Sequence, residues 1–141
     1  MKINLMTDYA VRVICSIYKS EKGILTSNHI SRVEEIPHGV LMKVLRQLRE
    51  SKIIKSHQGR GELVGGYTLR ASAKNITVLD IIEIMEGAIA LENIRNKKDN
   101  NKIENIEEDE ILKEYRRFSQ VFRKEMQKNT IYEILNGKTD K

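Results

Sequence analysis

The chain has 141 residues, about the length of one ordinary domain, and its 40% hydrophobic and 32% charged residues with a single proline are typical of a helix-rich globular protein, which excludes a disordered or fibrous chain. No stretch approaches the roughly 20 apolar residues that span a bilayer, and the first residues lack the apolar core of a signal peptide, so we expect a cytoplasmic protein that makes no membrane contact. The 25 lysines and arginines exceed the 20 aspartates and glutamates, and residues 36–74 hold eight basic and only two acidic residues, an asymmetry that indicates either a face for polyanions or a well-solvated surface.

A first helix is predicted from Thr7 or Asp8, both common N-cap types, to about Lys19. Its inward positions are Ala10, Val13, Ile14 and Ile17. Cys15 then lies near the edge of the buried face, where a half-buried structural thiol is favoured over a redox sensor. As the only cysteine, it excludes an intramolecular disulfide and a four-thiolate zinc or iron–sulfur site.

Two more helices are predicted to follow. Thr26 is a good N-cap for a short second helix that carries Ile30 and Val33 inward. A third helix begins with Pro37 in its first turn, where a missing backbone N–H is tolerated.

The third helix has two contrasting faces. Its buried stripe consists of Leu41, Val44, Leu45 and Leu48. The opposite face carries Gly39, Met42, Lys43, Arg46 and Arg49 or Glu50, with His38 at the helix start. One face is expected to pack and the other to be free to bind.

A hairpin is predicted after the third helix. Residues 53–57 and 67–70 read as two short strands, and the nine residues between them include four glycines, which indicates a flexible loop. Thr77 then caps a fourth helix that Gly87 ends. Residues 93–109 are rich in Asn, Lys and Glu and are predicted to form a mobile linker.

A long helix is predicted over residues 108–128, followed by a short one that starts at the capping box of Thr130 and Glu133 and ends at Asn136. The apolar stripe of the long helix consists of Ile111, Tyr115, Phe118 and Phe122, spaced by four, three and four residues. The stripe indicates a packing surface, either internal or against a second copy, and a dimerisation surface is favoured because a long helix after a linker has little else to pack on.

Three helices followed by a glycine-rich hairpin match a winged helix-turn-helix, so the predicted fold is mainly α with a small β wing and a long C-terminal dimerisation helix. We divide the chain into a DNA-binding unit at 1–74, a connecting helix and linker at 75–107, and a dimerisation helix with its tail at 108–141. The candidate DNA-binding residues on the third helix are His38, Gly39, Met42, Lys43 and Arg46, and those of the wing are Gln58 and Arg60. Cations on a helix can donate to guanine edges or phosphates, a methionine can contact a thymine methyl, and a wing arginine suits a narrow minor groove.

Four segments in this order resemble the Rrf2 family of bacterial transcription regulators. They are residues 5–13 (LMTDYAVRV), 40–49 (VLMKVLRQLR), 65–69 (GGYTL) and 76–87 (ITVLDIIEIMEG). The resemblance is strong over residues 1–87. It implies a homodimer that binds palindromic double-stranded DNA through its winged helix, with the long C-terminal helix crossing to the partner subunit.

The sequence also departs from the family pattern. Cluster-binding members carry three closely spaced cysteines after the Glu-Gly motif, whereas residues 88–109 contain neither cysteine nor histidine. Asp8 falls near a position that some relatives use as an additional ligand, yet it has no cluster to complete. The resemblance therefore implies a member without an iron–sulfur cofactor. The usual wing arginine aligns with Gln58, so its role passes to Arg60 only by a shift along a longer loop.

The main hypothesis is a sequence-specific regulator, with repression as the favoured mode, that responds to a regulatory protein or a small-molecule effector. The alternative is a winged-helix adaptor that docks a protein partner through the acidic residues 104–114 and binds DNA weakly. No nucleophile–base pair, phosphate loop or metal-ligand spacing is present, so neither an enzyme nor a metal site is predicted.

Overall fold

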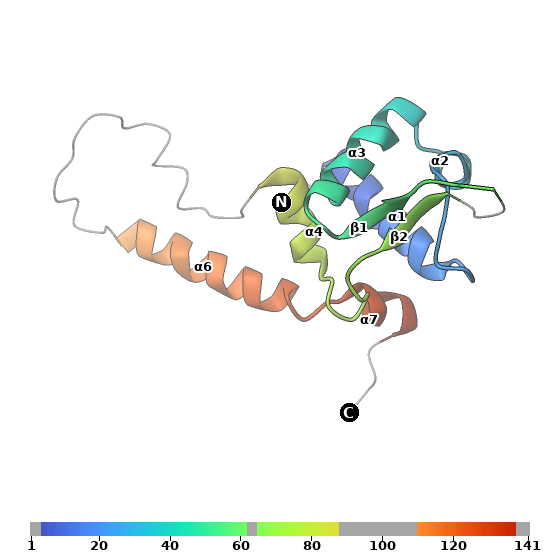
Figure 1. The fold of residues 1–141 in the computed structure, drawn as a ribbon. Helices are drawn as coiled ribbons and strands as arrows, with labels where there is room; N and C mark the ends of the chain where they lie inside the picture. The colour runs from blue at the N-terminus through green and yellow to red at the C-terminus, as the bar shows by residue number, and fades with distance from the viewer. Residues whose placement is uncertain (1–3, 62–64, 88–109, 138–141) are drawn as a thin grey trace.

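The computed structural model describes residues 4–61, 65–87 and 110–137, which form a helical body with one two-stranded antiparallel sheet (Figure 1). In chain order the elements are α1 (Leu5–Lys19), α2 (Ser27–Glu34), α3 (His38–Glu50), β1 (Ile54–His57), β2 (Gly66–Leu69), α4 (Val78–Glu86), α6 (Glu110–Met126) and α7 (Ile131–Asn136). This is the predicted order of a winged helix-turn-helix followed by further helices. The linker predicted at 93–109 lies outside the described residues.

The N-terminal caps follow the predictions at three helices and not at the first. Thr26, Thr77 and Thr130 each accept a hydrogen bond from a backbone N–H of the first turn, and the last two form complete capping boxes. Thr7 and Asp8, by contrast, lie inside α1, because Asn4 is the N-cap and its Oδ1 accepts from Met6 N at 3.0 Å. The prediction for α1 is therefore wrong at its start: an equally good cap stands three residues earlier, and Thr7 is buried.

Helix α2 buries less of its surface than its pattern indicates. Ile30 is fully buried, but Val33 is 56% exposed, so its inward placement is wrong. The reason is that α2 has only eight residues and is followed by its C-cap Glu35, whose left-handed backbone (φ 53°) redirects the chain. Ile36 then fills the core instead, at 2% exposure. Pro37 occupies the N-cap of α3, one position before the first turn, and its carbonyl accepts from Leu41 N.

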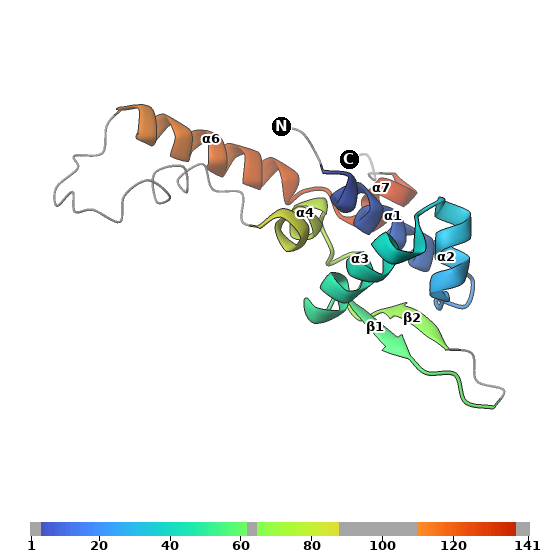
Figure 2. The same cartoon turned by 90° about the horizontal axis from the view of Figure 1, so that it is seen from above.

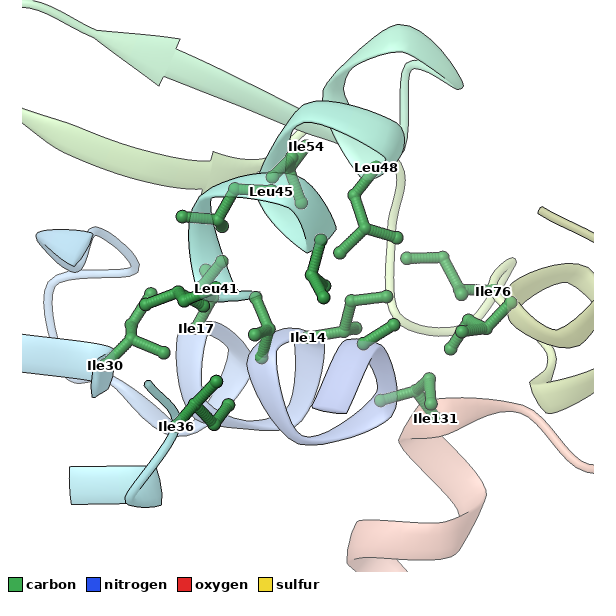
Figure 3. Close-up of a cluster of buried hydrophobic side chains, with 14 of the residues drawn as sticks. Ile14, Ile17, Ile30, Ile36, Leu41, Leu45, Leu48, Ile54, Ile76 and Ile131 are labelled. Atoms are coloured by element: carbon green, nitrogen blue, oxygen red, sulfur yellow. The ribbon is translucent and has the colours of Figure 1, made fainter. Parts of the chain in front are cut away.

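A single aliphatic core joins elements from both ends of the chain (Figure 3). Its labelled members are Ile14, Ile17, Ile30, Ile36, Leu41, Leu45, Leu48, Ile54, Ile76 and Ile131. The predicted stripe of α3 is buried in full, with at most 1% exposure at any of its four residues. Burial of each such side chain stabilises the folded state by about 1.5–3 kcal/mol relative to leaving it in water. This packing turns the other face of α3 outward.

The hairpin is joined to the helical body by Ile54 in the core and by a backbone pairing with the segment before α2. In the sheet Ile54 pairs with Leu69 and His57 with Gly66. Beyond it, the backbones of Leu25 and Tyr67 exchange two hydrogen bonds, of 3.1 and 2.7 Å. Gly66 allows this approach, because at its φ of 147° an added Cβ would lie 2.6 Å from the Leu25 carbonyl oxygen. Figure 2 shows the loop end of the hairpin pointing away from the helices.

Helix α6 extends from the body as an arm, and the chain then returns to the core (Figures 1 and 2). The arm packs against α4, where Ser119 is buried and Arg123 forms an ion pair with Glu83. After α6, the backbones of Thr77 and Thr130 form a bridge, and Ile131 N donates to Ile76 O at 2.8 Å. Helix α7 thereby packs near α1, where Tyr18 and Tyr132 meet edge to face.

Candidate nucleic-acid interface

The exposed face of α3 carries the residues predicted to contact DNA. His38, Gly39, Met42, Lys43 and Arg46 are all exposed and lie opposite the buried stripe. No Cβ at Gly39 would meet another atom within 4 Å, so its backbone is open to a close approach. The structure therefore brings these five residues together on one surface, and their contact with DNA stays a prediction.

The two predicted wing residues differ in their surroundings. Gln58 and Arg60 are both exposed, directly after β1. Gln58 lines a cleft that also touches α2 and α3, whereas Arg60 lines none of the clefts described below. The part of the loop with Glu62, Leu63 and Val64 lies outside the described residues. The structure thus connects Gln58 to the surface of α3.

Two adjoining clefts run from α3 to the hairpin, each about 260–280 Å³ in volume. The first is lined by Met42, Lys43, Arg46, Arg49 and Tyr67. The second is lined by Thr26, Ser27, Arg49, Ser56, His57, Gln58, Gly66 and Tyr67. Arg49 and Tyr67 belong to both, and we call the two together the junction cleft.

Sequence reasoning left out both shared residues as candidate sites. The helical spacing placed Arg49 or Glu50 on the exposed face of the third helix, and the position of Arg49 three residues after Arg46 could have selected it as a candidate site. Tyr67 could not have been selected in this way, because it reaches the cleft only through the pairing of β2 with Leu25.

The predicted dimerisation stripe lies largely on the surface of α6. Ile111 is 61% exposed, Tyr115 39% and Phe118 47%, while Phe122 is half-buried. Val121, which the stripe did not include, is 57% exposed. It joins Phe118 and Phe122 in a shallow apolar groove. Its position three residues after Phe118 is the signal that could have found it.

The described part of the acidic segment forms ordinary helix-surface pairs. Glu110 pairs with Lys113 at 3.7 Å and Glu114 with Arg117 at 2.5 Å. The hydrogen bond from Arg117 lowers the pKa of the Glu114 carboxyl. Such exposed pairs contribute little to stability, and they resemble a solvated helix face more than a docking site.

The predictions for metal ligands and membrane contact can be compared with the described ranges. Within residues 4–61, 65–87 and 110–137, no three His, Cys, Asp or Glu side chains are grouped so that they could hold a metal ion. No helix in those ranges combines the length and apolar character that crossing a membrane requires.

A helix-turn-helix unit, a two-stranded wing and a basic exposed face on the third helix together define a winged-helix protein of the transcription-regulator class. The family model of Rrf2, described as an iron-dependent transcriptional regulator, matches residues 3–137, and the chain belongs to this family. The family is one of transcriptional regulators.

Similar proteins were found among curated sequences and among solved structures. A Mycobacterium tuberculosis protein, Rv1287, named as a candidate HTH-type transcriptional regulator, is 26% identical over 91 residues, which make up 64% of this chain and 55% of that protein. The match thus spans about half the length of that relative. The structure of CymR, the global cysteine regulator of B. subtilis, superposes with a TM-score of 0.72 at 22% identity and covers 98% of both chains. IscR of T. potens gives a TM-score of 0.71 at 18% identity, over 96% of this chain and 87% of that one. These two likenesses show the fold.

The family description names iron, and the residues of this chain do not fit a thiolate-bound cluster. The sequence holds one cysteine, on α1, and residues 88–109 add neither cysteine nor histidine. Asp8, which the resemblance placed near a ligand position, accepts a hydrogen bond from Arg12 at 2.8 Å. A cluster held by several thiolates of this chain is therefore excluded, and no step of the function below passes through one.

Proposed function

We propose that this protein is a homodimeric, sequence-specific DNA-binding regulator that represses transcription from a palindromic operator and carries no iron–sulfur cluster. One observation carries the proposal: Lys43 and Arg46 project from an exposed face of α3, and neither makes an ion pair or hydrogen bond to a side chain within the described ranges. Cations left without a carboxylate partner on a recognition helix are suited to nucleic acid.

In this function α3 enters the major groove. Lys43 and Arg46 then donate to guanine O6 and N7, and Met42 contacts a thymine methyl. His38 and Gly39, in the first turn, let the helix start approach the bases or backbone closely. Gln58 and Arg60 follow the neighbouring backbone, with Arg60 in the minor groove, where the narrow groove attracts a cation.

Dimerisation supplies the second half-site. Two copies related by a two-fold axis would read two half-sites about one helical turn apart, which is why a palindrome is the expected operator. The supporting observation is the apolar surface of α6, formed by Ile111, Tyr115, Phe118, Val121 and Phe122. Monomeric proteins rarely leave such a contiguous apolar surface in water.

The test starts from an operator selected by the purified protein from a random duplex library. Binding of fluorescent duplexes is then followed by anisotropy for wild type, Lys43→Ala and Arg46→Ala. Loss of a base contact costs about 1–3 kcal/mol of discrimination between DNA sequences. Each variant should therefore reduce the ratio of affinities for the selected and the scrambled duplex by roughly fivefold or more.

Lys124→Ala is the matched control, because Lys124 is an exposed lysine on α6 and its removal changes the net charge equally. It should leave the discrimination intact. A wild-type protein that binds selected and scrambled duplexes equally well would contradict the proposal.

A further inference from the structure

We propose that the junction cleft is a seat for one DNA backbone phosphate, gripped by Arg49 from α3 and the Tyr67 hydroxyl from the wing. The inference rests on the proposed function, because the phosphate belongs to the bound duplex. It adds two residues that the base-reading set lacks, and it assigns them to positioning the protein rather than to reading sequence.

The cleft is held together by the fold before any ligand binds. Arg49 lies in the last turn of α3, whose other face is fixed by the core. Tyr67 is held from β2 by its two backbone hydrogen bonds with Leu25, which lies one residue before the cap of α2. Ser56 is the partner of Tyr67 across the sheet. Three elements therefore meet at one place.

The chemistry of the lining selects an oxyanion. Among the described residues that line the junction cleft there is no aspartate or glutamate. The cleft offers three cations and four hydroxyl groups, which come from Lys43, Arg46, Arg49, Thr26, Ser27, Ser56 and Tyr67. A guanidinium matches two phosphate oxygens with parallel hydrogen bonds, and a phenol hydroxyl can donate to the same group.

Three arginines elsewhere in the described ranges behave differently from Arg49. Arg12, Arg117 and Arg123 each pair with a carboxylate. Arg49 is exposed and makes no such pair with a described residue. His57 lines the cleft as well, but its Nε2 is engaged by Thr68 Oγ1 at 2.8 Å. Arg49 is thus a cation, unpaired among the described residues, that lines both clefts of the junction.

The position of the phosphate seat between α3 and the hairpin determines its proposed role. Arg49 lies three residues beyond Arg46, at the end of the base-reading face, while Tyr67 belongs to the hairpin. A phosphate bound to both would hold the wing and α3 at a set angle on the duplex. Phosphate contacts of this kind determine register and orientation and carry no sequence information themselves.

The first experiment compares Arg49→Met and Tyr67→Phe with wild type on selected and scrambled duplexes over a series of salt concentrations. Arg49→Met keeps the side-chain length and removes the charge, and Tyr67→Phe removes only the hydroxyl. Arg49→Met should weaken binding to both duplexes by the same factor, roughly tenfold or more. It should also lower the magnitude of the slope of log K against log salt by about 0.9 for each protomer bound. Tyr67→Phe should weaken both by roughly threefold or more without changing the slope.

Arg70→Met is the control, because Arg70 is exposed just after β2, away from the loop end, and its removal changes the charge equally. It should retain the wild-type slope. Equal behaviour of Arg49→Met and Arg70→Met would overturn the seat, and so would a loss confined to the selected duplex, which would make Arg49 a base-reading residue. Thermal unfolding confirms that each variant folds.

The second experiment locates the phosphate. Single uncharged methylphosphonate linkages are placed along the selected duplex. At one phosphate in each half-site the neutral linkage should weaken wild type and leave Arg49→Met unchanged. If the loss of affinity caused by the neutral linkage and the loss caused by Arg49→Met add at every position, the proposed phosphate seat is overturned.

Calorimetry with inorganic phosphate and with a nucleoside monophosphate, without DNA, separates the two sources of the anion. No saturable binding is expected at millimolar concentrations. Binding that disappears in Arg49→Met would assign the cleft to a free anion and overturn the DNA assignment. Failure of the proposed function itself is distinct, because it would appear as wild type binding no duplex selectively.

Discussion

At the scale of single residues, Cys15 shows how burial decides reactivity. It lies half-buried on α1, as the spacing of the apolar residues predicted. Burial raises the pKa of its thiol above the ordinary 9.0, although Lys19 acts in the opposite direction. The thiolate is the reactive form, so the thiol should be largely inert at neutral pH.

We therefore expect Cys15 to react with a thiol reagent such as DTNB several-fold more slowly in the native protein than in urea at pH 7.5. Reaction at equal rates in the two states would contradict the structural assignment.

The raised pKa of Cys15 also has a consequence for stability. The contribution of the thiol to the free energy of unfolding is present below the unfolded pKa of about 9 and is lost as the pH rises through the folded pKa. The difference in stability between wild type and Cys15→Ser should accordingly shrink above pH 9 in urea titrations.

Single residues also show where sequence patterns succeed. The α3 stripe and the threonine caps were predicted because they depend on local spacing and on local hydrogen bonds. Val33 was misplaced because the position at which a short helix ends, here the left-handed Glu35, shifts the inward role to Ile36. Tyr67 was missed because its partners come from a distant part of the chain.

At the scale of elements, α7 has a larger role than its six residues suggest. It was predicted as a last short helix, without a packing partner. In the structure Ile131 is fully buried in the core that also holds α1 and α3, while Ile134, one turn later, is 51% exposed. The C-terminal helix is thus part of the packing that supports the DNA-facing unit.

Ile131→Ala should lower the free energy of unfolding by about 2–5 kcal/mol, because it removes a buried aliphatic side chain and leaves a cavity. Ile134→Ala is the matched control and should change the free energy by less than about 0.5 kcal/mol. Urea unfolding followed by circular dichroism measures both. Equal effects of the two substitutions would show that α7 does not belong to the cooperative core.

At the scale of the whole molecule, the body and the arm of α6 divide two tasks. The body presents α3 and the wing on one side, and α6 extends from the opposite region (Figures 1 and 2). The ion pair of Arg123 with Glu83 and the buried Ser119 attach this arm to the body through α4. In the proposed dimer, any rearrangement of the two arms against each other would therefore move the two units proposed to bind DNA.

The dimer predicted from this arrangement can be tested by placing a charge in the apolar surface. Phe118→Asp and Val121→Asp should each convert a dimer to a monomer, because a carboxylate without a partner is costly to bury. Light scattering after size exclusion over a range of concentrations measures this. Affinity for the two-half-site operator should fall in parallel.

Val33→Asp is the control for these two substitutions, since Val33 is similarly exposed but lies on α2. It should remain dimeric. A wild-type protein that is monomeric at all concentrations, or a dimer that tolerates both α6 substitutions, would contradict the role assigned to α6.

The sequence by itself determined the order of the elements, the two faces of α3, three of the four threonine or asparagine caps and the absence of a set of thiolate ligands. These depend on residue types and on spacings within a turn or two, which the chain carries locally. The return of α7 to the core, the exposure of Val33 and the meeting of Arg49 with Tyr67 were decided by tertiary structure. Each depends on contacts between segments that are distant in sequence, such as the pairing of Leu25 with Tyr67, and only the packed core brings those segments together.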